Sequence, residues 1–217
     1  IENIIVDKMP LNFRYIGFIL MTFPKAKIIL ILRNQKDLML SFYKDEVARG
    51  LTLSYEKWMI NQISYDSITY LRYDKIINVL TKVFGKKNLV IDFYEDIFRD
   101  KKSMKKFLKQ ISSEKISINF NNLKINKSIN ENLLGLNRIM NYLIKTKLNT
   151  QSLTGSYEYL KTHNFLRYKL FPFISKILPD RNNKLNIKKF PYLIKIFRDS
   201  NKNLEKILNK KLSKEYY

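Results

Sequence analysis

An arginine and a serine eight positions apart, Arg33 and Ser41, are the residues of this sequence best suited to chemistry. Arg33 follows the β-branched run 27–32, and Ser41 lies about two turns into a helix expected from residue 35. A planar guanidinium can bind a phosphate through two hydrogen bonds, and a hydroxyl adds a neutral donor beside it. The spacing therefore predicts an anion site. A purely structural pair, with Arg33 bound to Asp37, stays open.

Polar side chains also follow two other stretches that read as strands. Asp7 and Lys8 come after residues 4–6, and Tyr94 comes after residues 88–93. Ligands of open parallel sheets bind at the carboxyl ends of the strands. We therefore expect these side chains and Arg33 to share one rim of a sheet.

The charge and the composition limit the classes of function. The chain has 41 Lys and Arg against 19 Asp and Glu, a net charge of +22, which favours polyanionic partners. Scattered lysines of a Lys- and Asn-rich composition explain the same surplus, and no module specific for nucleic acid is visible. Without cysteine and with His163 alone, disulfides, thiolate metal sites and histidine metal sites are not expected. The longest apolar run, 28–32, is too short for a transmembrane segment.

The elements that would position these residues follow a β-α-β-α-α-β-α order over residues 1–111. Gly50 ends the helix that starts at residue 35, Ser54 caps the next, and Asp100 caps the last. This order predicts an α/β fold with a parallel sheet flanked by helices. The elements are a strand at 4–6, a helix at 13–23, a strand at 27–32, a helix at 35–49, helical turns with a break from 54 to 84, a strand at 88–93 and a helix to 111.

Residues 112–217 read as a helix-rich C-terminal part of the same domain. Residues 117–132 are polar and Asn-rich, which predicts a loop, and residues 133–148 and 190–212 have helical spacing. We expect one domain with an α/β nucleotide-binding core at 1–111 and a helical part at 112–217.

Three segments resemble the sulfotransferase superfamily, in particular the bacterial members often fused to tetratricopeptide repeats. The 3′-phosphate-binding motif of that superfamily is similar to FPKAKIILILRNQKDLMLSFYK. Its next strand and "YED" corner resemble FGKKNLVIDFYEDIFRD, and the closing helix of many bacterial members resembles IFRDSNKNLEKILNKKLS. The order and spacing of the three segments make the resemblance specific.

The resemblance implies a P-loop-like sulfotransferase fold and 3′-phosphoadenosine 5′-phosphosulfate (PAPS) as sulfate donor. Arg33 and Ser41 would bind its 3′-phosphate, and Tyr94 would lie against its adenosine. Ser128, in an Asn-Lys-Ser loop, resembles a serine that touches the 5′ side of the nucleotide. A structural role stays open for both residues: Tyr94 could be an aromatic residue that caps a core strand, and Ser128 could belong to an ordinary polar loop. No metal is implied, because lysine and arginine can neutralise the developing charge.

Asp7 and Lys8 resemble the acidic-Lys pair of carbohydrate sulfotransferases. Asp7 would then deprotonate the acceptor hydroxyl, and Lys8 would neutralise charge on the sulfonate and the departing phosphate. An ion pair at a strand end or a helix cap is the alternative. A sugar hydroxyl is the preferred acceptor, and a tyrosine side chain or a lipid stays open as an alternative. The pocket for the acceptor is expected within residues 49–73 and 121–181.

One part of the family pattern has no counterpart in this sequence. Nothing between Ile1 and Phe23 resembles the Gly/Ser/Thr-rich loop that holds the 5′-phosphosulfate. We expect that loop upstream of Ile1, which would make this chain an inactive fragment of a cytoplasmic enzyme. The alternative function is a non-catalytic basic protein that binds acidic glycan or nucleic acid. A nucleotide kinase is disfavoured because no G-x-x-x-x-G-K-[ST] motif is present.

Overall fold

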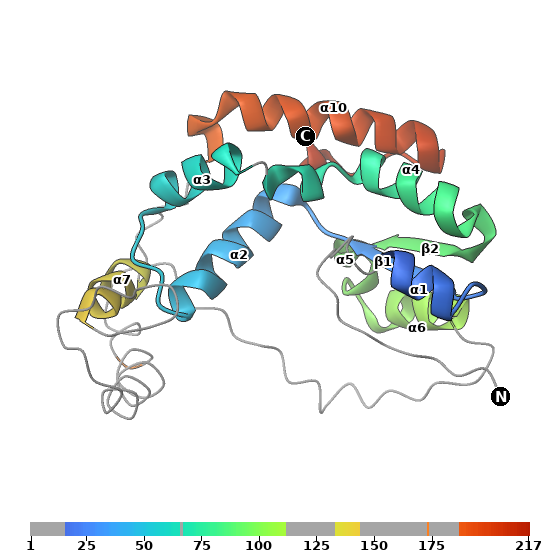
Figure 1. Ribbon diagram of the computed structural model, residues 1–217, viewed down its shortest axis with the longest axis horizontal. Coiled ribbons are helices and arrows are strands. Elements are labelled where there is room, and N and C mark those ends of the chain that lie inside the picture. Colours follow the sequence, from blue (N-terminus) through green and yellow to red (C-terminus); the bar gives the residue numbers. More distant parts are fainter. Residues whose placement is uncertain (1–15, 66, 112–132, 144–172, 174–186) are drawn as a thin grey trace. The chain divides into compact units, whose positions relative to one another are not determined.

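The computed structural model describes residues 16–65, 67–111, 133–143, 173 and 187–217 (Figure 1). These residues belong to two compact units. The first comprises the described parts of Ile1–Asn34, Ile68–Ile118 and Lys195–Tyr217, and the second those of Gln35–Ser67 and Asn119–Ile194. The strand expected at residues 4–6 and the loop expected at 117–132 lie outside the described residues. The expectation of one domain stays a prediction.

Two parallel strands, β1 (Ile28–Leu32) and β2 (Leu89–Phe93), form the centre of the first unit. They pair in register from Ile28 opposite Leu89 to Leu32 opposite Phe93. Apart from Asp92 in β2, both strands consist of β-branched and other apolar residues, which pack well on a pleated, half-buried surface. The structure confirms these two strands of the predicted sheet. Because they run in the same direction and in register, the residues that follow them, Arg33 and Tyr94, lie at the same rim.

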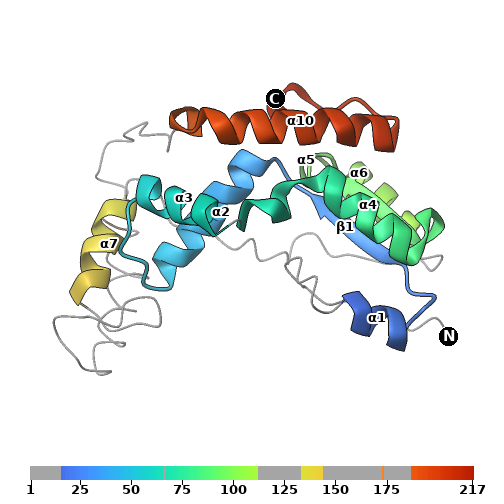
Figure 2. The same ribbon diagram turned by 45° about the horizontal axis from the view of Figure 1, so that its top comes forward.

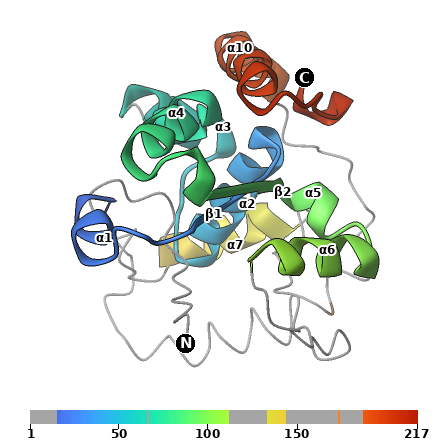
Figure 3. The same cartoon turned by 90° about the vertical axis from the view of Figure 1, so that its right-hand side faces the viewer.

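Helices cover both sides of this strand pair, which confirms the predicted α/β class. Figure 3 shows α4 (Tyr73–Phe84) and α6 (Lys101–Ile111) on opposite sides of the strands. The helix α6 buries Met104 and Phe107, three residues apart and hence on one face. The core between the strands and α4 also takes in α10 and the end of the chain. Its buried members are Leu32, Tyr73, Ile76, Ile77, Leu80, Phe84, Phe93, Leu204 and Tyr216.

Short connections precede the two strands and follow the second. The helix α1 (Ile16–Thr22) ends before Pro24, and a turn closed by the Ala26 N–H on the Phe23 carbonyl (3.0 Å) leads into β1 (Figure 2). Before β2 the chain makes a 3-10 turn, η3 (Lys86–Asn88). After β2 it makes the single helical turn α5 (Tyr94–Ile97), and Asp100 caps α6 through the Ser103 N–H (2.7 Å), as predicted.

From Lys195 onward, the long helix α10 (Pro191–Leu208) belongs to the first unit, where it lies beside α4. The buried Asp74 of α4 accepts hydrogen bonds from the Ser200 hydroxyl (2.5 Å) and the Asn203 side-chain amide (3.3 Å). The helix was expected to reach residue 212 and ends four residues earlier. Asn209 takes a positive φ of 49°, and the Lys210 N–H donates to the Glu205 carbonyl (3.2 Å), which is a Schellman end. The 3-10 turn η8 (Lys214–Tyr216) follows.

The second unit contains α2 (Gln35–Ala48), α3 (Tyr55–Ser64), α7 (Leu134–Leu143) and the 3-10 turn η7 (Ile187–Lys189). Gly50, at φ 112°, follows the end of α2, and the Ser54 hydroxyl caps α3 by accepting the Lys57 N–H (3.3 Å). Both signals were read correctly from the sequence. The break expected within residues 54–84 is also present: the 3-10 turn η2 (Ser67–Leu71) separates α3 from α4.

An aromatic cluster and a buried asparagine hold the second unit together. Tyr43 of α2 packs against Tyr55 (ring centroids 5.2 Å apart) and Trp58 (5.5 Å) of α3. Asn141 of α7 is buried and donates to the carbonyls of Val47 (2.8 Å) and Leu51 (2.9 Å). Carbonyls at a helix end have no partner within the helix, so Asn141 satisfies that of Val47 in the last turn of α2 and also that of Leu51 in the segment after it.

Candidate functional site

Arg33 and Tyr94 meet at the carboxyl rim of the two strands. The guanidinium carbon of Arg33 lies 4.9 Å from the centroid of the Tyr94 ring, within the range of a cation–π contact. Arg33 is half-buried, whereas Tyr94 is 39% exposed and packs on its other neighbour, Phe98, at a centroid distance of 4.6 Å. The rim therefore presents a cation and an accessible aromatic ring side by side.

The peptide bond between Arg33 and Asn34 is held from two sides. Its carbonyl accepts the hydroxyl of Tyr73 (2.6 Å), and its N–H donates to Oε1 of Glu95 (2.8 Å). Burial raises the pKa of Tyr73 above its usual value, so its hydroxyl remains a donor into the alkaline range. The point at which the chain leaves the strand is thus fixed by α4 on one side and α5 on the other.

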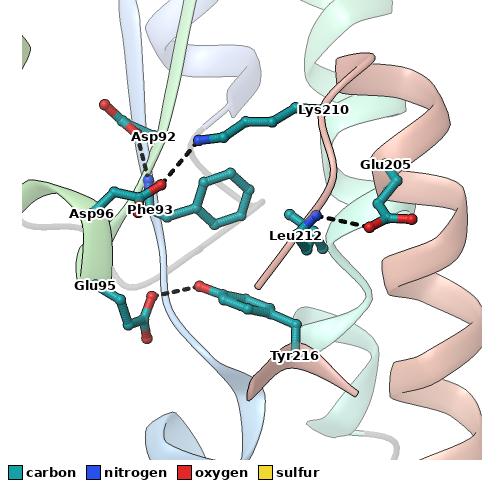
Figure 4. Close-up of polar contacts among 8 residues, drawn as sticks. All are labelled: Asp92, Phe93, Glu95, Asp96, Glu205, Lys210, Leu212 and Tyr216. Carbon is teal, nitrogen blue, oxygen red and sulfur yellow. Dashed lines mark hydrogen bonds and ion pairs between the residues drawn. The ribbon is translucent and has the colours of Figure 1, made fainter. Parts of the chain in front are cut away.

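Glu95 also binds the end of the chain, as Figure 4 shows. Its Oε2 accepts the hydroxyl of Tyr216 (2.5 Å), and the Tyr216 ring meets Phe93 edge to face at 5.4 Å. Burial, together with the hydrogen bond to Glu95, raises the pKa of Tyr216. The side-chain amide of Asn34 donates to the carbonyl of Glu215. The last turn of the chain is therefore part of this rim.

The segment between α10 and this last turn makes three further contacts (Figure 4). The ammonium of Lys210 pairs with Asp96 (2.9 Å) and lies 4.7 Å from the centroid of Phe93. The Leu212 N–H donates to Glu205 (2.7 Å), and this bond lowers the pKa of the Glu205 carboxyl. The pair of Lys210 and Asp96 is about half exposed, so its contribution to stability is small.

Comparison with known proteins identifies the family. A model of the sulfotransferase family matches residues 2–111, which include both strands and the rim residues from Arg33 to Asp96. The chain belongs to the sulfotransferase family. It is also similar to an uncharacterized protein of Aquifex aeolicus (strain VF5), with 50% identity over 44 residues, which are 20% of this chain and 6% of that protein. No solved structure matches this chain.

The sulfotransferase rim contains two of the six site residues that the sequence predicted. Arg33 and Tyr94 lie together in the first unit. Ser41 lies in the second turn of α2, in the second unit, and is half-buried. Its pairing with Arg33 stays a prediction. Asp7, Lys8 and Ser128 lie outside the described residues, so their roles stay predictions as well.

The sequence did not reveal the residues that fix Arg33. Asn34 directly follows Arg33 and Glu95 directly follows Tyr94 in the sequence, but nothing there indicated that Asn34 and Glu95 bind one another. Tyr73 and Tyr216 are 40 and 121 positions from their partners Arg33 and Glu95. A buried tyrosine reads in a sequence as an ordinary core residue, and only the fold supplies its partner.

The chemistry available at the rim is the recognition of an anion that carries an aromatic ring. The arginine offers charge and N–H donors, and the tyrosine offers a partly exposed aromatic ring. Within the described residues no group of three His, Asp or Glu side chains is placed to hold a metal ion. None of the described helices has the length and apolar character needed to cross a membrane.

Proposed function

We propose that this chain contains the 3′-phosphate half of a PAPS site and belongs to an enzyme that transfers a sulfuryl group to an acceptor hydroxyl or amine. Family membership supports the reaction class. The single observation that carries the donor assignment is the position of the Arg33 guanidinium over the exposed Tyr94 ring, at the carboxyl rim of parallel strands.

The residues at the rim fit such a nucleotide. A guanidinium that lies with its face on a ring keeps the N–H groups in its own plane available for phosphate oxygens. Arg33 would bind the 3′-phosphate with Ser41, and Tyr94 would lie against the adenosine. A point charge such as lysine could not hold the ring contact and two parallel hydrogen bonds at once, which is why an arginine suits this position.

The donor supplies the sulfuryl group when it is bound, and the remaining roles belong to residues of this chain. Asp7 would take the proton of the acceptor hydroxyl, and Lys8 would neutralise charge on the sulfonate and the departing phosphate. Ser128 would contact the 5′ side of the nucleotide. The preferred acceptor is a sugar hydroxyl, because an acidic residue precedes the lysine.

Calorimetric titration with adenosine 3′,5′-bisphosphate tests the donor site. The change Arg33→Ala removes a charge-assisted contact and should weaken binding about tenfold or more, since such hydrogen bonds contribute about 1.5–3 kcal/mol. Arg198→Ala is the matched control, because Arg198 is exposed on α10 and its loss changes the net charge equally. Equal affinities of the two variants would show that binding reflects charge alone, and the donor site would be wrong.

The lysines of α6 favour a second candidate, a basic protein that binds acidic glycan or nucleic acid without catalysis. Five lysines in this eleven-residue helix are exposed: Lys101, Lys102, Lys105, Lys106 and Lys109. Binding of either kind would weaken with salt, because any contact with a polyanion releases counterions. A binder of this second kind would not distinguish adenosine 3′,5′-bisphosphate from AMP, whereas the sulfate-donor site would.

A further inference from the structure

We infer that Glu95 and Tyr216 are positioning residues of the donor site, which hold Arg33 in the orientation that binds the 3′-phosphate. Neither is assigned to contact the donor. They would act through the backbone of Arg33 and Asn34, so the last turn of the chain belongs to the nucleotide site. The inference rests on the proposed function of Arg33.

The first step is the geometry around a single peptide. Tyr73 holds its carbonyl and Glu95 holds its N–H, at 2.6 and 2.8 Å. A peptide gripped at both polar atoms cannot rotate about its neighbouring φ and ψ angles without losing one of these bonds. The direction in which the Arg33 side chain leaves the strand is set by these same angles.

The second step is the position of Glu95 in the chain. It follows Tyr94 directly, so the carboxylate that holds the Asn34 N–H also fixes the turn that carries the ring. The same carboxylate therefore positions both Arg33 and Tyr94. Their contact at 4.9 Å depends on both ends of this link.

The third step is that Tyr216 holds Glu95 and is itself held. The two oxygens of the Glu95 carboxylate take different partners, Asn34 and Tyr216, so the carboxylate cannot turn without breaking one bond. The Tyr216 side chain is buried, and the backbone carbonyl of Tyr216 accepts a hydrogen bond from the side-chain amide of the buried Asn201 on α10 (2.6 Å). The contact of Asn34 with the Glu215 carbonyl closes the network.

These contacts would affect binding through the position of the Arg33 guanidinium. A bidentate grip on phosphate requires the donor groups to lie within about 0.5 Å of the productive position. Loss of the Tyr216 hydroxyl removes the bond to one oxygen of the Glu95 carboxylate, so the carboxylate holds the Arg33–Asn34 peptide less firmly. The arginine would keep its charge and its exposure but would meet the phosphate in fewer productive orientations.

The test compares the affinities for adenosine 3′,5′-bisphosphate and AMP in four versions of the full chain. Tyr216→Phe removes one hydroxyl and keeps the ring against Phe93, and Glu95→Gln keeps the size of the side chain but not its charge. Tyr192→Phe is the control, since Tyr192 is 65% exposed on α10. We expect the preference for the bisphosphate over AMP to fall about three- to tenfold in the first two variants and to stay unchanged in the control.

Two measurements distinguish positioning from a loss of folding. Circular dichroism gives the folded fraction of each variant, and affinities are expressed per folded molecule. Amide hydrogen exchange at Asn34 should be faster in Glu95→Gln than in the wild-type chain. A merely structural role would lower the folded fraction and leave the preference of the folded molecules intact, which would overturn the inference.

The outcomes separate this inference from the proposed function. If Arg33→Ala abolishes the preference for the 3′-phosphate while Tyr216→Phe and Glu95→Gln retain it, the donor site stands and the positioning role is wrong. If the wild-type chain shows no preference, the proposed function fails and the inference falls with it. If either of the two variants fails to fold, the other one decides.

Discussion

At the scale of residues, the contact of Arg33 with Tyr94 combines two properties that neither residue has alone. The guanidinium lies within cation–π distance of the ring, and a guanidinium carries N–H groups that can also donate hydrogen bonds to a phosphate. The types of both residues and their positions after strands were predictable, because strand ends of a parallel sheet meet at one rim. Their contact was not, since it depends on the register that pairs Leu32 with Phe93.

The ring of Tyr94, and not its hydroxyl, should matter for nucleotide binding. We expect Tyr94→Phe to bind adenosine 3′,5′-bisphosphate within about twofold of the wild-type affinity, because the stacking face is retained. Tyr94→Leu should bind about three- to fivefold more weakly, because it lacks the ring that would lie against the adenosine and also loses the contact that holds the Arg33 guanidinium, and a cation–π contact at an exposed site contributes about 0.5–1 kcal/mol. Calorimetry measures both. If Tyr94→Phe binds as weakly as Tyr94→Leu, the hydroxyl is the important group and the stacking role is wrong.

At the scale of elements, the caps and the β-branched runs were readable, while the polar contacts between distant elements were not. Ser54, Asp100 and Gly50 act within a few residues of themselves, so local chemistry determined their roles. Asp74 shows the opposite case. In the sequence it is an acidic residue in the first turn of a helix, where solvent exposure would be normal, yet the fold buries it against α10.

The change Asp74→Ala should destabilise the first unit. It leaves the hydroxyl of the buried Ser200 and the amide of Asn203 without this acceptor, and an unsatisfied buried polar group costs about 1–3 kcal/mol. Urea unfolding followed by circular dichroism measures the loss. The control Asp45→Ala breaks only the exposed pair with Arg49, which contributes at most about 1 kcal/mol. Equal midpoints for the two variants would contradict a structural role of Asp74.

At the scale of the whole chain, buried tyrosines link stability to alkaline pH. Burial raises the pKa of Tyr55 to about 12, and it raises those of Tyr73 and Tyr216 as well. Between the ordinary tyrosine value near 10 and these raised values, the unfolded chain has lost protons that the folded chain keeps. Folding is therefore disfavoured progressively as the pH rises through this window.

We expect the free energy of unfolding to decrease steeply above about pH 10, measured by urea titrations at a series of pH values. The change Tyr55→Phe should make this decrease shallower, because it removes one of the groups that titrate only in the unfolded chain. Tyr65→Phe, at an 81% exposed position, is the control and should keep the wild-type slope. A slope that is the same in all three chains would show that Tyr55 does not titrate as its burial implies.

The net charge of +22 is also a property of the whole chain, and it does not by itself identify a ligand. Charge predicts affinity for anions in general, whereas the rim at Arg33 predicts discrimination between two nucleotides that differ in one phosphate. The most direct test of the account is therefore the ratio of the affinities of the wild-type chain for adenosine 3′,5′-bisphosphate and AMP, measured by calorimetry at one ionic strength. We predict that the bisphosphate binds at least about tenfold more tightly, as one charge-assisted phosphate contact implies. Equal affinities would contradict the assignment of this rim to the 3′-phosphate of a sulfate donor.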